Sequence, residues 1–79
     1  MEFARTEAEL AERAARFLKA ESKRANITYE ELAKRLAAYG LRETRDSIAS
    51  KLKRGTFPAT FFLACLAALG LETVRLVDI

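Results

Sequence analysis

The side chains best suited to chemistry in this sequence are the cations between residues 34 and 54. This segment carries seven lysine and arginine residues against two acidic residues, whereas the segments before and after it are each slightly acidic. A local excess of positive charge attracts polyanions. The segment therefore predicts a surface that binds a negatively charged polymer. Its cations are Lys34, Arg35, Arg42, Arg45, Lys51, Lys53 and Arg54.

Other kinds of functional site lack the residues that they need. The sequence has no histidine and a single cysteine, Cys65, so neither a zinc finger nor a disulfide framework can form. Cys65 lies in an apolar stretch with no histidine to activate it, and we expect a buried, inert thiol. No glycine-rich phosphate loop, metal-ligand cluster or catalytic triad is present. We therefore expect no enzyme activity, no metal or other cofactor, and no small-molecule ligand.

Helices must position the cations. Thr6 with Glu9 and Thr28 with Glu31 match the capping box, in which a hydroxyl and a carboxylate each satisfy a free backbone N–H at a helix start. Many alanines and few β-branched residues favour helices throughout, and 79 residues suffice for one small domain. We expect a single all-α domain, residues 1–79, with helices at 6–24, 29–39, 45–54 and 58–69 and a short β-like tail at 72–79.

Apolar spacing predicts which side of each helix is buried. The first helix has an apolar face at Leu10, Ala14, Phe17 and Leu18, and the third has one at Ile48, Ala49 and Leu52. The fourth helix is apolar nearly all round, which predicts either a central position or a face that is left for a partner.

Two short helices joined by a glycine-containing turn, with a polar face on the second, are typical of a helix-turn-helix. Three phrases in order strengthen this pattern: Thr28-Tyr-Glu-Glu-Leu-Ala33, Ala49-Ser-Lys-Leu-Lys-Arg-Gly55, and the stretch from Pro58 to Leu69-Gly70. Through these phrases, residues 28–71 resemble the DNA-binding domains of the lambda-repressor-like (Cro/repressor, XRE-type) superfamily, with the motif at 28–55. The phrase Lys-Arg-Gly-Thr-Phe-Pro-Ala-Thr-Phe-Phe also resembles one in a small bacterial family of uncharacterised function, which implies no activity.

The sequence departs from the superfamily pattern at two points. The turn glycine of the familiar motif follows the helix alanine by four residues, whereas Gly40 follows Ala33 by seven. The second helix is therefore nearly a turn longer, or the connection to the third helix is wider. The usual acidic residue before Arg-Gly is replaced by Lys53, which adds charge where phosphates would lie.

The resemblance implies sequence-selective binding of double-stranded DNA by a small transcriptional regulator, with helix 45–54 in the major groove. Arginine and lysine donate to guanine and hydroxyls donate or accept, so the expected base contacts are Arg45, Ser47, Ser50 and Lys51. Cations and helix N-termini attract phosphate, so the expected phosphate contacts are Thr28, Lys34, Arg35, Thr44, Lys53 and Arg54.

Such a regulator is expected to act as a homodimer on a two-fold site, with its recognition helices ~34 Å apart. The tail at 72–79 is a possible dimerisation strand, because it would pair with its twin across the two-fold axis. The alternative is a tail that packs as extended coil. The expected dimer contacts are Phe61, Phe62, Val74 and Leu76.

Two other functions stay open. One is a protein-interaction module on the same fold that binds no nucleic acid, which the long spacing from Ala33 to Gly40 favours and the basic segment opposes. The other is RNA binding through the same cations. A lone cysteine is compatible with a reducing cytosol, and the run from Phe57 to Leu71 is too short to span a membrane. We expect a cytoplasmic, bacterial-type protein.

Overall fold

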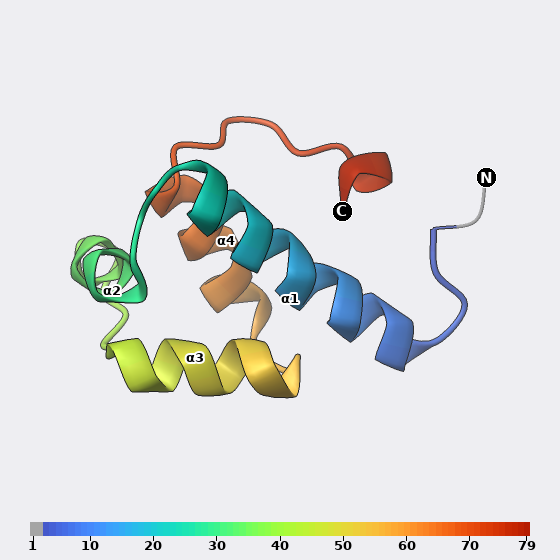
Figure 1. Cartoon of the computed structure of the whole chain (residues 1–79), viewed down its shortest axis with the longest axis horizontal. Coiled ribbons are helices and arrows are strands. Elements are labelled where there is room, and N and C mark those ends of the chain that lie inside the picture. The colour runs from blue at the N-terminus through green and yellow to red at the C-terminus, as the bar shows by residue number, and fades with distance from the viewer. Residues whose placement is uncertain (1–2) are drawn as a thin grey trace.

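Four α-helices make up most of the fold. The structure, a computed structural model, describes residues 3–79. The helices are α1 (Glu7–Arg24), α2 (Tyr29–Ala37), α3 (Arg45–Arg54) and α4 (Ala59–Ala68), and a short 3-10 turn follows at Leu76–Asp78. In Figure 1, α4 lies at the centre, with α1 crossing it, α3 beneath it and α2 to one side. The expectation of an all-α fold is confirmed.

Threonine caps begin three of the helices. The hydroxyl oxygens of Thr6, Thr28 and Thr44 accept hydrogen bonds from backbone N–H groups three residues further on, at 3.1, 3.1 and 3.0 Å. Each bond satisfies a donor that the helix itself leaves unpaired. Gly55 ends α3 in the left-handed conformation, with φ of 74°, which residues with a Cβ adopt only at a cost. The start and stop of α3 are therefore both encoded locally.

The connection between α2 and α3 is wide. The second helix ends at Ala37, two residues before its expected end, and residues 38–44 join it to α3. The N–H groups of Gly40 and Leu41 bond back to carbonyls in the last turn of α2, at 3.0 and 3.2 Å. These bonds terminate the helix at this point. Of the two explanations for the long spacing, the wider connection is thus the correct one.

The core lies around α4. This helix is apolar on nearly every side, but only one side is buried: Phe61 and Cys65 are each about 1% exposed, whereas Leu63 is 62% exposed. All three remaining helices contribute leucine or isoleucine side chains to the same cluster. Burying each such side chain stabilises the fold by about 1.5–3 kcal/mol. The core members from α1, α2 and α3 are Ala15, Leu18, Leu32, Leu36, Ile48 and Leu52.

The inward face of α1 differs from the expected one. Ala15, Leu18 and Ser22 are buried, whereas Leu10 is 46% exposed. Small side chains on the inward row allow close approach, because a Cβ built on Gly55 would lie 3.5 Å from the carbonyl oxygen of Ala11. If Leu10 faced inward instead, its larger side chain would hold the loop after α3 further from α1.

The tail folds back on α1. It is not a strand: it runs along the domain and ends in the 3-10 turn, and residues 3–79 contain no β-strand. The guanidinium of Arg13 donates to the backbone carbonyl of Ile79 through Nε, at 2.8 Å, and also through Nη2. This contact explains the difference from the expected β-like tail, because it holds the end of the described segment against a helix of the same chain.

Candidate nucleic-acid interface

The third helix has a buried side and an exposed side. Ile48 and Leu52 face the core and are 0% and 2% exposed. Four residues of the opposite face are exposed to solvent: Asp46, Ala49, Ser50 and Lys53. The expectation that Ala49 lies on the apolar face was therefore wrong, because the buried row of α3 is Ile48 and Leu52 and Ala49 is exposed. The exposed side of α3 is a polar surface interrupted by one small side chain.

Two of the expected base contacts face away from that surface. Ser47 donates from Oγ to Oε1 of Glu43, at 2.6 Å, and the Lys51 ammonium lies 3.0 Å from both Glu43 carboxylate oxygens. The side chains of Glu43 and Lys51 are only 9% and 25% exposed, and the ammonium lies 5.6 Å from the centre of the Phe61 ring. Ser47 and Lys51 are therefore bound to the connection that precedes α3, and Lys51 also lies over Phe61 of α4, which differs from the role expected of them.

The other two expected base contacts are accessible. Ser50 is exposed on the outward face of α3. Arg45 is exposed at the start of the helix, where its Nε donates to Oδ1 of Asp46 at 3.2 Å. A surface ion pair of this kind contributes only about 0–1 kcal/mol, so the guanidinium is free to exchange its partner. The carboxylate of Asp46 orients Arg45 until that exchange.

The expected phosphate contacts divide into free and engaged cations. Lys34, Lys53 and Arg54 are exposed, and none of them forms an ion pair with another residue in the range 3–79. Arg35 is engaged: it donates to Glu31 at 3.1 Å and to the carbonyl of Ala68 at 3.0 Å. Its second bond satisfies an acceptor at the end of α4, where a cation is favourable. Arg35 is thus a link between α2 and α4.

Thr28 and Thr44 are caps. Each side chain is occupied by a backbone N–H of its own helix. The first turns that they begin carry carboxylates, which are Glu30 and Glu31 in α2 and Asp46 in α3. These carboxylates interact with the positive end of the helix dipole and oppose an incoming phosphate. The two helix N-termini are therefore weaker phosphate sites than the free cations.

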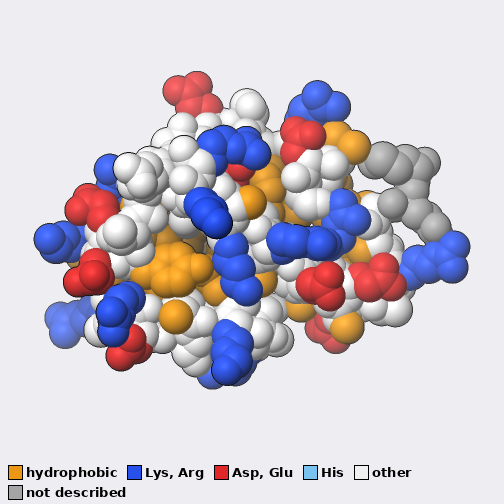
Figure 2. Space-filling model, viewed as in Figure 1, with side chains coloured by type: hydrophobic (Ala, Val, Ile, Leu, Met, Phe, Trp, Pro, Cys, Tyr) orange, Lys and Arg blue, Asp and Glu red, His pale blue; other side chains and the backbone are white. Residues whose placement is uncertain are grey.

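One face of the molecule is rich in cations. Figure 2 shows Lys and Arg side chains across the middle of the molecule, with few acidic side chains among them. Two further free cations were not among the expected contacts. Arg42 lies in the connection before α3 and Lys19 on α1, and both are exposed without an ion-pair partner among the described residues. Arg42 belongs to the basic segment, so its omission was avoidable. No pattern along the chain places Lys19 near α3.

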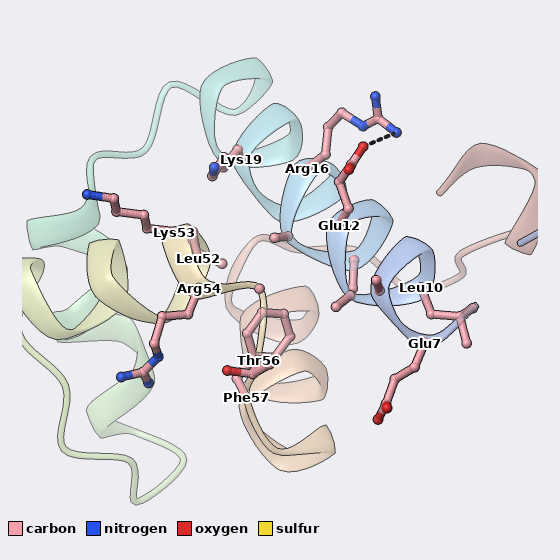
Figure 3. A pocket seen from close by; sticks show the side chains of 15 residues that line it. Glu7, Leu10, Glu12, Arg16, Lys19, Leu52, Lys53, Arg54, Thr56 and Phe57 are labelled. Atoms are coloured by element: carbon pink, nitrogen blue, oxygen red, sulfur yellow. Dashed lines mark ion pairs between the residues drawn. The ribbon is translucent and has the colours of Figure 1, made fainter. Parts of the chain in front are cut away.

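An open groove separates α1 from the end of α3. Its floor and walls include Ala11, Ala15 and Leu52, and Phe57 follows at the start of the next element. Figure 3 shows Lys19 and Lys53 on opposite sides of one end of this groove, with Arg54 nearby. The far end is acidic, because Glu7 lines it.

The expected dimer contacts are not equally accessible. Phe61 is 1% exposed and belongs to the core, so it has no surface to offer a partner, and its expected interface role was wrong. Phe62 is half-buried against Phe57, with ring centres 6.3 Å apart. Val74 is half-buried, and Leu76 is 64% exposed in the tail. Of the four expected dimer contacts, Leu76 is therefore the most accessible, and Leu63 on α4, which was not among them, is 62% exposed.

Burial changes the pKa of two side chains, Cys65 and Tyr29. Burial raises the pKa of Cys65 to about 12, and the Glu43 carboxylate adds to this shift, so the thiol stays protonated at neutral pH. Burial also raises the pKa of Tyr29. Within residues 3–79, no group of three His, Cys, Asp or Glu residues is arranged to hold a metal ion. No helix in the same range is both long and apolar enough to cross a membrane.

Comparison with known proteins gives one match. Residues 10–74 match the family described as "Domain of unknown function (DUF6471)". No curated protein and no solved structure matches the chain. Because the matched segment is well over half of the sequence, the chain belongs to this family.

Proposed function

We propose that this protein binds double-stranded DNA sequence-selectively, as a small transcriptional regulator, with the exposed face of α3 in the major groove. A helix of ten residues is about 15 Å long, and the major groove is about 12 Å wide, so α3 fits across a few base pairs. The observation that best supports this proposal is that the polar residues of α3 fall into two groups. The inward ones are bound to Glu43, whereas the outward ones have no partner that would hold them back from DNA.

The contacts divide between bases and phosphates. Arg45 and Ser50 are the side chains proposed to reach base edges, because both are exposed on α3 and neither belongs to the Glu43 network. Lys53, Arg54 and Arg42 are proposed to contact phosphates, because they carry charge without an ion-pair partner in the described chain. Lys34, which is equally unpaired, extends the positive surface onto α2. Phosphate contacts position α3, and base contacts give the sequence preference.

The proposal includes a homodimer on a two-fold site in the cytoplasm, where bacterial DNA lies. Leu76 and Val77 of the tail are 64% and 42% exposed, and they offer apolar surface for a second copy. Pairing of two tails as strands is not part of the proposal, because Arg13 holds the end of the tail on α1. The number of protein chains per duplex, measured by light scattering, distinguishes a dimer from a monomer on DNA.

The test is fluorescence anisotropy of a labelled mixed-sequence duplex, titrated with protein at several salt concentrations. The variant Lys53→Gln with Arg54→Gln removes two free cations at the end of α3. Its control is Lys23→Gln with Arg24→Gln, which removes two neighbouring cations at the end of α1. We expect the first variant to lower the slope of log affinity against log salt by about 1.8, since each phosphate contact contributes about 0.9. The control is expected to keep the slope.

Three outcomes would contradict the proposal. If the protein binds no duplex even at low salt, a protein-interaction module becomes the better-supported function. If a duplex RNA of the same sequence competes better than the DNA, the cations serve RNA. If both double variants lose the same slope, binding follows net charge and does not use α3. Circular dichroism of each variant checks that the helices remain folded.

A further inference from the structure

The groove between α1 and α3 has one end that is positively charged and made by both helices. Lys19 comes from α1, and Lys53 and Arg54 come from the last turn of α3. In Figure 3 Lys19 on α1 and Lys53 on α3 border the same end of the groove, and the flexible side chain of Lys53 extends away from α1. None of the three forms an ion pair within residues 3–79. Three unneutralised charges therefore share one end of one groove.

The other charged residues of the groove do not neutralise this end. Arg16 is paired with Glu12 one turn away, at 3.6 Å, and both side chains are largely exposed. Glu7 lies at the opposite end, at the beginning of α1. The groove thus has a charge gradient along α1, from acidic at its start to basic at its middle. A ligand with negative charge is attracted to the basic end only.

A structural role accounts for Lys53 and Arg54 but not for Lys19. Cations in the last turn of a helix interact favourably with the negative end of its dipole, and Lys53 and Arg54 occupy that turn of α3. Lys19 lies five residues before the end of α1 and therefore comes before its last turn. It has neither a dipole to satisfy nor a carboxylate partner among the described residues.

Close packing keeps the two walls together. A Cβ built on Gly55 would lie 3.5–3.7 Å from backbone and side-chain atoms of Ala11, so α1 and the end of α3 meet without a large side chain between them. Lys19 is two turns further along α1 from this contact, on the same groove. The distance between the Lys19 and Lys53 anchor points is therefore fixed by the fold, and only their flexible side chains adjust.

We propose that Lys19 and Lys53 bind one phosphate group of the DNA backbone across this groove, which makes α1 part of the DNA-binding surface. The inference rests on the proposed function and deepens it. Lys19 contributes a contact that lies outside the helix-turn-helix itself. An ammonium on a flexible stem neutralises a phosphate without reading bases, so the contact raises affinity equally for all sequences. It also anchors the end of α3 that is far from its capped start.

The experiment compares three single variants by the anisotropy titration described above. Lys19→Gln removes the proposed contact, and Lys19→Arg keeps the charge. Lys23→Gln is the matched control, because Lys23 is an exposed lysine on the same helix, one turn further on, that does not line the groove. We expect Lys19→Gln to weaken binding about five- to tenfold on every duplex and to lower the salt slope by about 1, while the other two variants bind like the unmodified protein.

Each other outcome overturns the inference. If Lys19→Gln binds like the unmodified protein, α1 does not contact DNA, although binding through α3 stands. If Lys19→Gln and Lys23→Gln lose the same affinity, the effect is one of overall charge and the groove is not a site. If Lys19→Gln changes the preferred sequence, the residue reads bases and does not hold a phosphate. If the unmodified protein binds no DNA, the proposed function and this inference fail together.

Discussion

Replacing Glu43 by Gln removes the negative charge that binds two side chains of α3 to the connection before it. The Glu43 carboxylate accepts from the Ser47 hydroxyl and from the Lys51 ammonium, and it is nearly buried. Glutamine has almost the same shape, so the variant changes the charge and leaves the packing. The ammonium of Lys51 then lies in a largely buried position beside Phe61, without its partner.

The expected loss of stability follows from the geometry of the pair. At 3.0 Å and an effective dielectric constant of about 20, the attraction between the two charges is about 5.5 kcal/mol. Desolvation of both groups offsets more than half of this. Breaking a fully buried pair by removing one partner costs about 3–5 kcal/mol. Because Lys51 keeps 25% of its side-chain exposure and can turn toward water, we expect Glu43→Gln to lower the free energy of unfolding by about 2 kcal/mol.

Urea denaturation followed by circular dichroism measures this loss. A double-mutant cycle with Glu43→Gln and Lys51→Met isolates the interaction between the two residues, and we expect a coupling of about 1.5–2 kcal/mol. The same cycle at Glu12 and Arg16 is an internal control. That pair is 3.6 Å apart and about 70% exposed on both sides, so its expected coupling is about 0.3–0.5 kcal/mol.

Equal coupling in the two cycles would refute this reasoning, because it would mean that burial adds nothing to the Glu43–Lys51 pair. A Lys51→Met variant more stable than the unmodified protein would refute it as well. In that case the core, and not the ion pair, would hold α3 in place.

Two further predictions concern buried groups on α1 and α4. The pKa of Cys65 is raised to about 12 in the folded protein, so above about pH 9 the thiol ionises in the unfolded state only, and stability is lost as the pH rises from 9 toward 12. Cys65→Ala should therefore show a smaller fall in the urea midpoint between pH 8 and pH 10.5, and an equal fall would contradict the burial argument. The Ser22 hydroxyl is buried without a hydrogen-bond partner. Ser22→Ala should therefore raise the free energy of unfolding by about 1 kcal/mol. A loss of stability in the same urea assay would show that the hydroxyl is hydrogen-bonded.

The helices could be predicted because their ends are encoded locally. Thr28 and Thr44 cap the two central helices from within three residues, and Gly55 ends α3 through its own backbone conformation. The inward face of α1 was harder, since Leu10 and Ala11 offer two rows that differ by one residue. The row that faces inward depends on how closely the loop at Gly55 approaches α1. This approach cannot be predicted from a local sequence pattern.

The candidate site was predicted in part. Asp46, Ser50 and Arg54 are exposed on α3, as expected from its period. Ser47 and Lys51 were misassigned because Glu43 was counted only as a charge. The three residues are spaced four apart, which would have indicated a shared helical side and an acceptor for both. The position of Lys19 beside Lys53 depends on the crossing of α1 and α3, so it required the tertiary structure.

The Glu43 network has a consequence for how this chain tolerates change in length. Glu43 lies in the last part of the wide connection and is bound to α3 itself, so this attachment does not depend on the path from Ala38 to Gly40, before Leu41 packs on the core. Lengthening that connection from seven residues to ten costs only about 0.3 kcal/mol of loop-closure entropy. Insertions before Leu41 should therefore leave the outward face of α3 where it is, which makes this connection a suitable place to graft a peptide tag.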